Sequence, residues 1–206
     1  MTRIGILGGA FDPPHIGHLT GAEKVREEFG LDKIIFIPTY IPPHKNLPKA
    51  SPDKRLEMVE IAIQGKPYFE VSDIEIKRKG ISYTVDTIRE LKQIYSKDEL
   101  YLIIGMDEAK DFINWKKPKK LLKFCKFIIL TRPGFQPEAA ELLAHKKEEV
   151  PEPLRKTVQF LSLNLDISST MIRELVKKSN SIKSFVPEGV ENYIKENKLY
   201  SQKTNE

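Results

Sequence analysis

Hydrophobic residues in this chain gather in short continuous runs that are separated by segments with helical spacing. A continuous apolar run is typical of a parallel strand covered on both faces. Four runs predict such strands: Ile4–Leu7, "KIIFIP" (33–38), "LYLIIG" (100–105) and "KFIILT" (126–131). "VQFLSL" (158–163), which includes two polar residues, predicts a fifth strand. "YFEVSDIEI" (68–76) predicts a sixth strand, and "KRKGIS" after it predicts a turn.

Helical patterns lie between these runs. Apolar residues at three- and four-residue spacing predict a helix over residues 16–29. Ser51 and Pro52 predict the start of a helix that runs to about residue 64, and Thr84 is the expected cap of a helix that runs to Tyr95. Further helices are expected around 137–147 and from Ser169 and Pro187.

Strands and helices therefore alternate along the chain, without internal repeats or an obvious linker. This order predicts a single α/β domain over residues 1–206, with a Rossmann-like, doubly wound, mostly parallel sheet and helices on both faces. The last part, from about residue 168, is expected to be helical.

Composition narrows the class of protein. The 206 residues are 40% hydrophobic and 31% charged, with a net charge of +5 that favours anionic ligands without indicating nucleic acid. No window approaches the roughly 18–20 apolar residues that span a bilayer, and the first apolar run is too short for a signal peptide. We therefore expect a cytoplasmic protein without a membrane partner. Cys125, the only cysteine, excludes internal disulfides and lies in an apolar run typical of a buried thiol.

The stretch "GGAFDPPHIGH" (8–18) carries the strongest chemical signal. A glycine turn between a first strand and a helix is the usual phosphate end of a doubly wound sheet, although the common dinucleotide and P-loop spacings are absent. His15 and His18 are one helical turn apart, so their rings should project from the same face beside unpaired backbone N–H groups. Gly17 would let a base or a ribose approach the helix closely. This arrangement suits a polyphosphate.

Two other interpretations of these histidines carry less weight. They could cap a helix or fill a gap, but the surrounding glycines and prolines favour a ligand site. A zinc site would need a third ligand, and the spacing is not that of a zinc helix. The run "KKPKKLLK" (116–123) could be taken for a nucleic-acid patch, but a solvated helix face is the better interpretation.

Eight blocks together resemble the nicotinate-nucleotide adenylyltransferases of the nucleotidyltransferase superfamily. They are "GGAFDPPHIGH", "IPPHK" (41–45), "GISYTVDTI" (80–88), "IGMD" (104–107), "NW" (114–115), "TRPG" (131–134), "ISSTMIR" (167–173) and "VPEGVENYI" (186–194). They span nearly the whole chain in the family's order. Two positions depart from the family pattern: Ala10, where threonine is common, and Lys116, where an aromatic residue often follows the tryptophan.

The resemblance implies transfer of AMP from ATP to nicotinate mononucleotide, which gives nicotinate adenine dinucleotide and pyrophosphate in NAD biosynthesis. It implies four catalytic residues, His15, His18, Lys45 and Arg173. The other residues that it implies for ATP binding are Gly8, Gly9, Phe11, Gly17, Gly105, Asp107, Arg132, Ser168 and Ser169. Those implied for the acceptor are Lys45, Ser82, Tyr83, Thr84, Trp115 and Lys116.

Elementary chemistry is consistent with this residue set. The attacking phosphate is already ionised near pH 7, because its second pKa is about 6, so no general base is required. Cationic donors and helix N-termini suffice to align two anions and to stabilise the leaving pyrophosphate. We expect Mg²⁺ to arrive mainly on the ATP phosphates, without a dedicated protein metal site.

Other activities remain candidates at this point. A sister adenylyltransferase could prefer nicotinamide mononucleotide; phosphopantetheine as acceptor is disfavoured, because it has no flat ring to stack on Trp115. A catalytically silent nucleotide-binding module is the candidate from a different class, and the retained histidines, Lys45 and Arg173 argue against it. We also count a homo-oligomer among the candidate assemblies.

Overall fold

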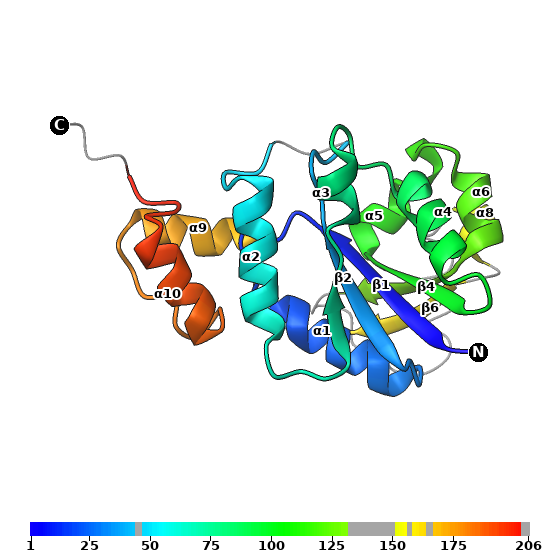
Figure 1. The fold of residues 1–206 in the computed structure, drawn as a ribbon, viewed down its shortest axis with the longest axis horizontal. Coiled ribbons are helices and arrows are strands. Elements are labelled where there is room, and N and C mark those ends of the chain that lie inside the picture. The colour runs from blue at the N-terminus through cyan, green and yellow to red at the C-terminus, as the bar shows by residue number, and fades with distance from the viewer. Residues whose placement is uncertain (44–46, 132–150, 156–157, 164–166, 203–206) are drawn as a thin grey trace.

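A computed structural model of the chain describes residues 1–43, 47–131, 151–155, 158–163 and 167–202. Within these ranges, six parallel strands form one sheet in the order β3-β2-β1-β4-β5-β6 (Figure 1). The strands are β1 (Arg3–Gly9), β2 (Lys33–Pro38), β3 (Phe69–Val71), β4 (Glu99–Gly105), β5 (Lys126–Thr131) and β6 (Val158–Ser162). The predicted parallel α/β fold is thereby confirmed.

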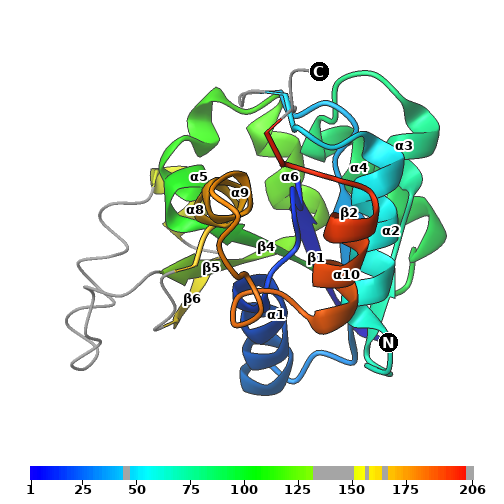
Figure 2. The same ribbon diagram turned by 90° about the vertical axis from the view of Figure 1, so that its left-hand side faces the viewer.

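The helices cover both faces of this sheet. In chain order they are α1 (Ile16–Glu28), α2 (Pro52–Ile63), α3 (Ile74–Arg78), α4 (Thr84–Ile94), α5 (Met106–Lys110), the short 3₁₀ helix η1 (Phe112–Asn114), α6 (Pro118–Phe124), α8 (Glu152–Arg155), α9 (Ser169–Lys177) and α10 (Glu188–Glu196). Figures 1 and 2 show α10 alongside α2 at one end of the molecule. None of the helices in the described ranges has the length and hydrophobicity to cross a membrane.

Alternation along the strands creates two hydrophobic cores, one on each face of the sheet. Leu7, Phe36 and Ile103 point into the core that α1, α2, α9 and α10 cover. Ile6 and Ile35, one position away, point into the core that α4, α5 and α6 cover. Burial on both faces explains why the strands have continuous apolar runs.

The order of the strands places a ligand site at the centre of the sheet. From β1 the chain winds outward through β2 and β3, and from β4 it winds outward the other way through β5 and β6. The winding therefore reverses between the neighbouring strands β1 and β4. In open parallel sheets, ligands bind in the crevice beyond the carboxyl ends of the strands at such a reversal.

Two local predictions were wrong. The strand expected over 68–76 ends at Val71, and Ile74–Arg78 forms a helical turn instead. Both Ile74 and Glu75 turn towards the interior, which the alternation of a strand does not allow. Thr84 is the first helical residue and not the cap: Tyr83 has the extended conformation of the N-cap. The helix expected around 137–147 lies outside the described residues.

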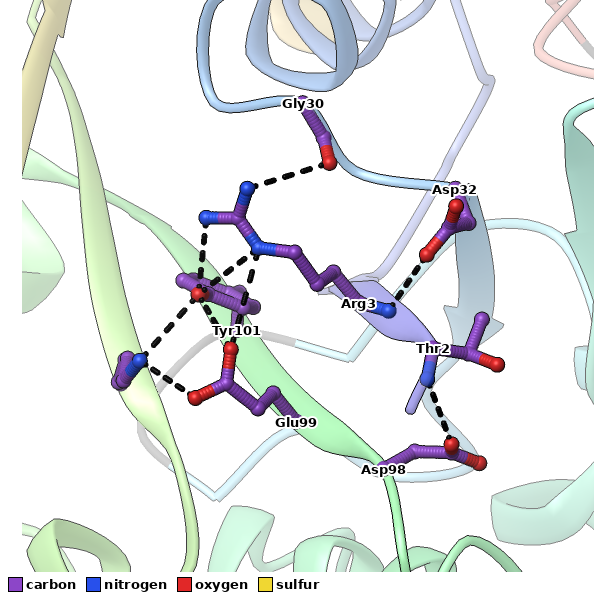
Figure 3. A network of polar contacts seen from close by, with 8 residues as sticks. Thr2, Arg3, Gly30, Asp32, Asp98, Glu99 and Tyr101 are labelled. Atoms are coloured by element: carbon purple, nitrogen blue, oxygen red, sulfur yellow. Dashed lines mark hydrogen bonds and ion pairs between the residues drawn. The ribbon is translucent and has the colours of Figure 1, made fainter.

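A polar network ties together the amino ends of three neighbouring strands, at the edge opposite their carboxyl ends (Figure 3). The hydroxyl of Tyr101, a residue that is 2% exposed, accepts hydrogen bonds from Arg3 Nε at 3.2 Å and Nη2 at 3.0 Å. It donates to Glu99 Oε2 at 3.0 Å, and Lys126 Nζ donates to Glu99 Oε1 at 2.6 Å. The hydrogen bonds from Lys126 and Tyr101 lower the pKa of Glu99.

We predict that Tyr101→Phe destabilises the fold without affecting the ligand crevice. The substitution removes the hydroxyl that joins Arg3 to Glu99, which should lower the free energy of unfolding by about 1–2 kcal/mol. Urea unfolding followed by tryptophan fluorescence measures this change. A variant with the same free energy of unfolding as the wild type would show that the hydrogen bonds of this hydroxyl do not stabilise the fold.

Candidate active site

Phe11, in the segment between β1 and α1, anchors this segment in the hydrophobic core. Its backbone has a φ of 48°, in the left-handed region, and its ring is 2% exposed. The ring contacts those of Phe36 and His18, with centroids 5.8 and 5.0 Å away. A Cβ at Gly9 would lie 3.3 Å from this ring, which explains the glycine. Phe11 therefore shapes the loop from the core, and its backbone is the part that can face a nucleotide.

His15 and His18 lie together at the start of α1, as the spacing predicted. His15 is the N-cap residue, and its backbone N–H donates to His18 Nδ1 at 3.2 Å. The two rings stack, with centroids 3.6 Å apart and planes 22° from parallel. Because Nδ1 of His18 accepts a hydrogen bond, the neutral ring carries its proton on Nε2. That tautomer presents a donor suited to a phosphate oxygen.

Gly17 has a role that the sequence did not indicate. A Cβ at this position would lie 3.0 Å from His15 Nδ1 and 3.1 Å from His15 Cε1. Glycine therefore leaves room for the imidazole of His15 to lie flat against the start of the helix. Approach of a base or ribose at this position stays a prediction.

Two buried charged residues, Asp12 and Arg55, hold the loop before His15 and were missed by sequence reasoning. Asp12 is 4% exposed, and its carboxylate accepts hydrogen bonds from the backbone N–H groups of Lys49 at 2.7 Å and Ala50 at 3.0 Å. Arg55 of α2 is fully buried and donates to the carbonyls of Ala10 at 2.6 Å, Thr39 at 2.5 Å, Tyr40 at 3.2 Å and Ala50 at 3.2 Å. Burial lowers the pKa of Arg55, and the charge of Asp12 opposes that shift.

The start of α9 reaches the same loop from the far end of the chain. Ser168 caps this helix, since its Oγ accepts from the backbone of Met171 at 3.2 Å. The hydroxyl of Ser169 donates to the carbonyl of Pro13 at 2.8 Å, and Arg173 Nη1 donates to the carbonyl of Asp12 at 2.7 Å. Residues more than 150 positions apart thus meet at the loop before the histidines. Their binding of ATP stays a prediction.

A third loop follows β4, next to β1 in the sheet. Gly105, with extended backbone, is the N-cap of α5, and its N–H donates to Glu108 Oε2 at 3.1 Å. Asp107 lies exposed in the first turn of α5. Gly8, the second-last residue of β1, is exposed and has open space around its α-carbon, so this end of the strand is accessible.

The residues expected to bind the acceptor gather around the start of α4. The N–H of Ser82 donates to the carbonyl of Ile41 at 2.8 Å, and its hydroxyl accepts from the N–H of Tyr40 at 2.9 Å, so this loop adjoins the one after β2. Lys116 Nζ lies 2.9 Å from Asp86 Oδ2 and 4.0 Å from the centroid of the Tyr83 ring. Lys116 therefore stands directly over the first turn of α4.

Asp86 and Trp115 lie on either side of Lys116 in the contacts at the start of α4. Slight burial opposes the shift, but the hydrogen bond and charge of Lys116 lower the pKa of Asp86. Trp115 is half-buried, with its ring centroid 5.6 Å from that of Phe112. One part of the indole therefore packs on the core, and the rest is accessible beside Lys116.

Glu75 lies beneath the start of α4 and was not singled out from the sequence. It is 5% exposed and accepts a hydrogen bond from Thr87 Oγ1 at 2.6 Å. Burial raises its pKa, and hydrogen bonds from Thr87 and Ser82 oppose that shift. No sequence pattern distinguishes this carboxylate from an exposed one, because its burial depends on the unexpected helix α3.

Two of the predicted site residues, Lys45 and Arg132, lie outside the described residues. Across the part of the chain that the structure does describe, no three histidine, cysteine, aspartate or glutamate side chains gather closely enough to hold a metal ion. Cys125 is buried, as expected, and burial raises the pKa of its thiol to about 12.

Known proteins match this chain over most of its length. The cytidylyltransferase-like family model matches residues 6–175. A relative from Desulfitobacterium hafniense (strain Y51), named probable nicotinate-nucleotide adenylyltransferase, is 48% identical over 96% of this chain and 95% of its own. One of the same name from Dictyoglomus thermophilum is 46% identical over 96% of this chain and 99% of its own.

Solved structures share the fold. Plasmodium falciparum nicotinic acid mononucleotide adenylyltransferase, in complex with NaAD, superposes with a TM-score of 0.77 at 22% sequence identity, covering 97% of this chain and 98% of that one. A crystal structure from Vibrio parahaemolyticus, named putative nicotinate-nucleotide adenylyltransferase, gives a TM-score of 0.67 at 20% identity, covering 98% of this chain and 97% of that one. With the sheet order, the paired histidines and the relatives all in agreement, the chain belongs to the cytidylyltransferase-like family and, within it, to the nicotinate-nucleotide adenylyltransferases.

Proposed function

We propose that this protein transfers AMP from ATP to nicotinate mononucleotide, forming nicotinate adenine dinucleotide and pyrophosphate. The observation that carries the proposal is the meeting of the His15–His18 pair, Arg173 and the start of α9 at the loop that follows β1, the strand that pairs with β4. These groups supply N–H donors and positive charge where a polyphosphate would bind. The relatives' names support the same activity.

The reaction needs positioning more than acid–base chemistry. An oxygen of the acceptor's 5′-phosphate attacks the α-phosphorus of ATP and forms the new phosphoanhydride bond. The bond from the α-phosphorus to the bridging β-phosphate oxygen breaks, and its electron pair leaves with pyrophosphate. Both reactants are anions, so the protein must hold them in line and stabilise the charge that grows on the leaving group. His18 Nε2–H and the Arg173 guanidinium are the side-chain donors that we assign to this task.

We expect Mg²⁺ to enter this site already bound to the ATP phosphates. The carboxylate of Asp12, in the loop before His15, is buried and already accepts several hydrogen bonds, so it is a poor ligand for an incoming cation. Phosphate oxygens are the ligands that Mg²⁺ commonly takes in such reactions, and the ion would neutralise part of their charge.

Selection of the acid acceptor would come from the group around the start of α4. A nicotinate carboxylate is negatively charged, whereas the amide of nicotinamide is neutral. Lys116 provides a cation above this helix start, and Thr84 provides a hydroxyl and a backbone N–H in its first turn. Trp115 offers a flat face that would stack equally well on either pyridine ring.

Pyrophosphate release from ATP, measured with each acceptor in turn, tests the proposed function. We expect nicotinate mononucleotide to be preferred over nicotinamide mononucleotide by at least about 100-fold in kcat/KM, which corresponds to roughly two lost hydrogen bonds. Phosphopantetheine should give no release. Preference for the amide would overturn the assignment, and no release with any acceptor would favour a silent nucleotide-binding module.

We predict that His18→Ala reduces kcat by about 100-fold or more while weakening ATP binding much less, because the donor matters most as charge develops in the transition state. Since His18 Nδ1 also accepts from His15, the alanine variant loses a helix-cap contact as well. His18→Asn separates the two effects: its Oδ1 can replace Nδ1 as acceptor, but it lacks a donor at Nε2. Equal turnover of His18→Asn and the wild type would contradict the catalytic role.

Thr84→Val and Trp115→Ala should affect the acceptors differently. Thr84→Val removes a hydroxyl donor, so we expect the ratio of kcat/KM for the two mononucleotides to narrow by roughly tenfold. Trp115→Ala removes a stacking surface that does not distinguish the rings, so both values should fall together. Steady-state kinetics with both mononucleotides measures this, and an unchanged ratio in Thr84→Val would exclude the threonine from acid recognition.

A further inference from the structure

The end of the chain returns to the loop that carries the phosphate motif. Tyr200 follows α10, and its hydroxyl donates to Asp12 Oδ1 at 2.8 Å, across 188 positions of sequence. Its ring packs on the core shared by α1, α2, α9 and α10. Nothing in the reaction described above uses this tyrosine.

Asp12 is the point at which three segments of the site meet. One of its oxygens accepts from Lys49 and the other from Ala50, in the segment that leads from the 39–43 loop into α2. Arg173 Nη1 of α9 lies 3.8 Å from Oδ2 and donates to the backbone carbonyl of the same residue. This one residue therefore joins the segment before α2 to Arg173 of α9.

Tyr200 is held firmly in this contact. Its φ of 62° lies in the left-handed region, which an aromatic residue adopts only when its surroundings impose it. Burial, with the adjacent charge of Asp12, raises its pKa well above the usual value, so the hydroxyl stays protonated and acts as the donor. A charge-assisted hydrogen bond of this kind is stronger than a neutral one.

We propose that Tyr200 is a positioning residue for the ATP-phosphate site, acting through Asp12 on Arg173 and on the segment before α2. The inference rests on the proposed function, because it assumes that ATP binds beside Arg173. Loss of the hydroxyl should let the carboxylate shift towards Arg173, pairing more closely with the guanidinium and withdrawing it from the phosphates.

Tyr193 is a matched control within the same part of the chain. Its hydroxyl donates to Glu57 Oε2 at 2.6 Å and thereby fastens α10 to α2. Burial and the neighbouring Glu57 raise its pKa to about 12. Tyr193→Phe thus removes the same atom from the same C-terminal region, but from a contact that does not include Asp12.

The test compares Tyr200→Phe with Tyr193→Phe at a temperature below the melting point of both. For Tyr200→Phe we expect kcat/KM for ATP to fall about tenfold, and KM for nicotinate mononucleotide to stay within about twofold, as loss of one hydrogen bond to a charged group predicts. Tyr193→Phe should leave both values within about twofold of the wild type. An unchanged kcat/KM for ATP in Tyr200→Phe, or an equal fall of this value in both variants, would overturn the proposal.

Two further measurements keep the outcome decisive. The effect of Tyr200→Phe on ATP affinity should shrink in an Asp12→Asn background, and full additivity would contradict an action through Asp12. Calorimetric titration with a non-hydrolysable ATP analogue needs no acceptor, so it tests Tyr200 even if the wild type fails to use nicotinate mononucleotide.

Discussion

The geometry of the proposed phosphate site depends on the hydrogen bonds that the buried carboxylate of Asp12 accepts. A carboxylate that is 4% exposed must be matched by hydrogen bonds or by opposite charge. Its donors come from the segment before α2 and from the end of the chain, and the buried guanidinium of Arg55 lies close by. Satisfying this one group therefore requires the loops after β1 and β2 and the C-terminal part to be in place together.

The two edges of the sheet use polar groups for different purposes. At the amino edge, Tyr101, Arg3 and Glu99 satisfy one another and join the strands. At the carboxyl edge, α1 and α5 begin where β1 and β4 end, and Ser169 of α9 contacts the loop between β1 and α1. Helix starts of this kind present backbone donors that can meet an anion. Catalysis in the proposed reaction follows from this convergence, since the nucleophile is already charged and no side chain need take a proton from it.

Much of this arrangement could be predicted from the sequence because it depends on local pattern. Continuous apolar runs predicted the parallel strands, and the spacing of His15 and His18 predicted two rings on one face. The predicted strand over 68–76 was wrong because burial of Ile74 and Glu75 on α3 is set by tertiary packing. Arg55 and Tyr200 were missed for a related reason: their partners lie far away in the sequence, and neither belongs to a motif of known chemistry.

The contacts of Asp12 imply that its loop is already formed before ATP binds, and amide hydrogen exchange of Lys49 and Ala50 tests this most directly. Both N–H groups lie outside helices and strands and donate to the Asp12 carboxylate. In the unliganded protein we expect each to exchange at least about tenfold more slowly than an exposed loop amide, in line with a hydrogen bond to a charged acceptor. Asp12→Asn should remove most of this protection. Rapid exchange in the unliganded wild type, with protection appearing only when ATP is added, would contradict the account.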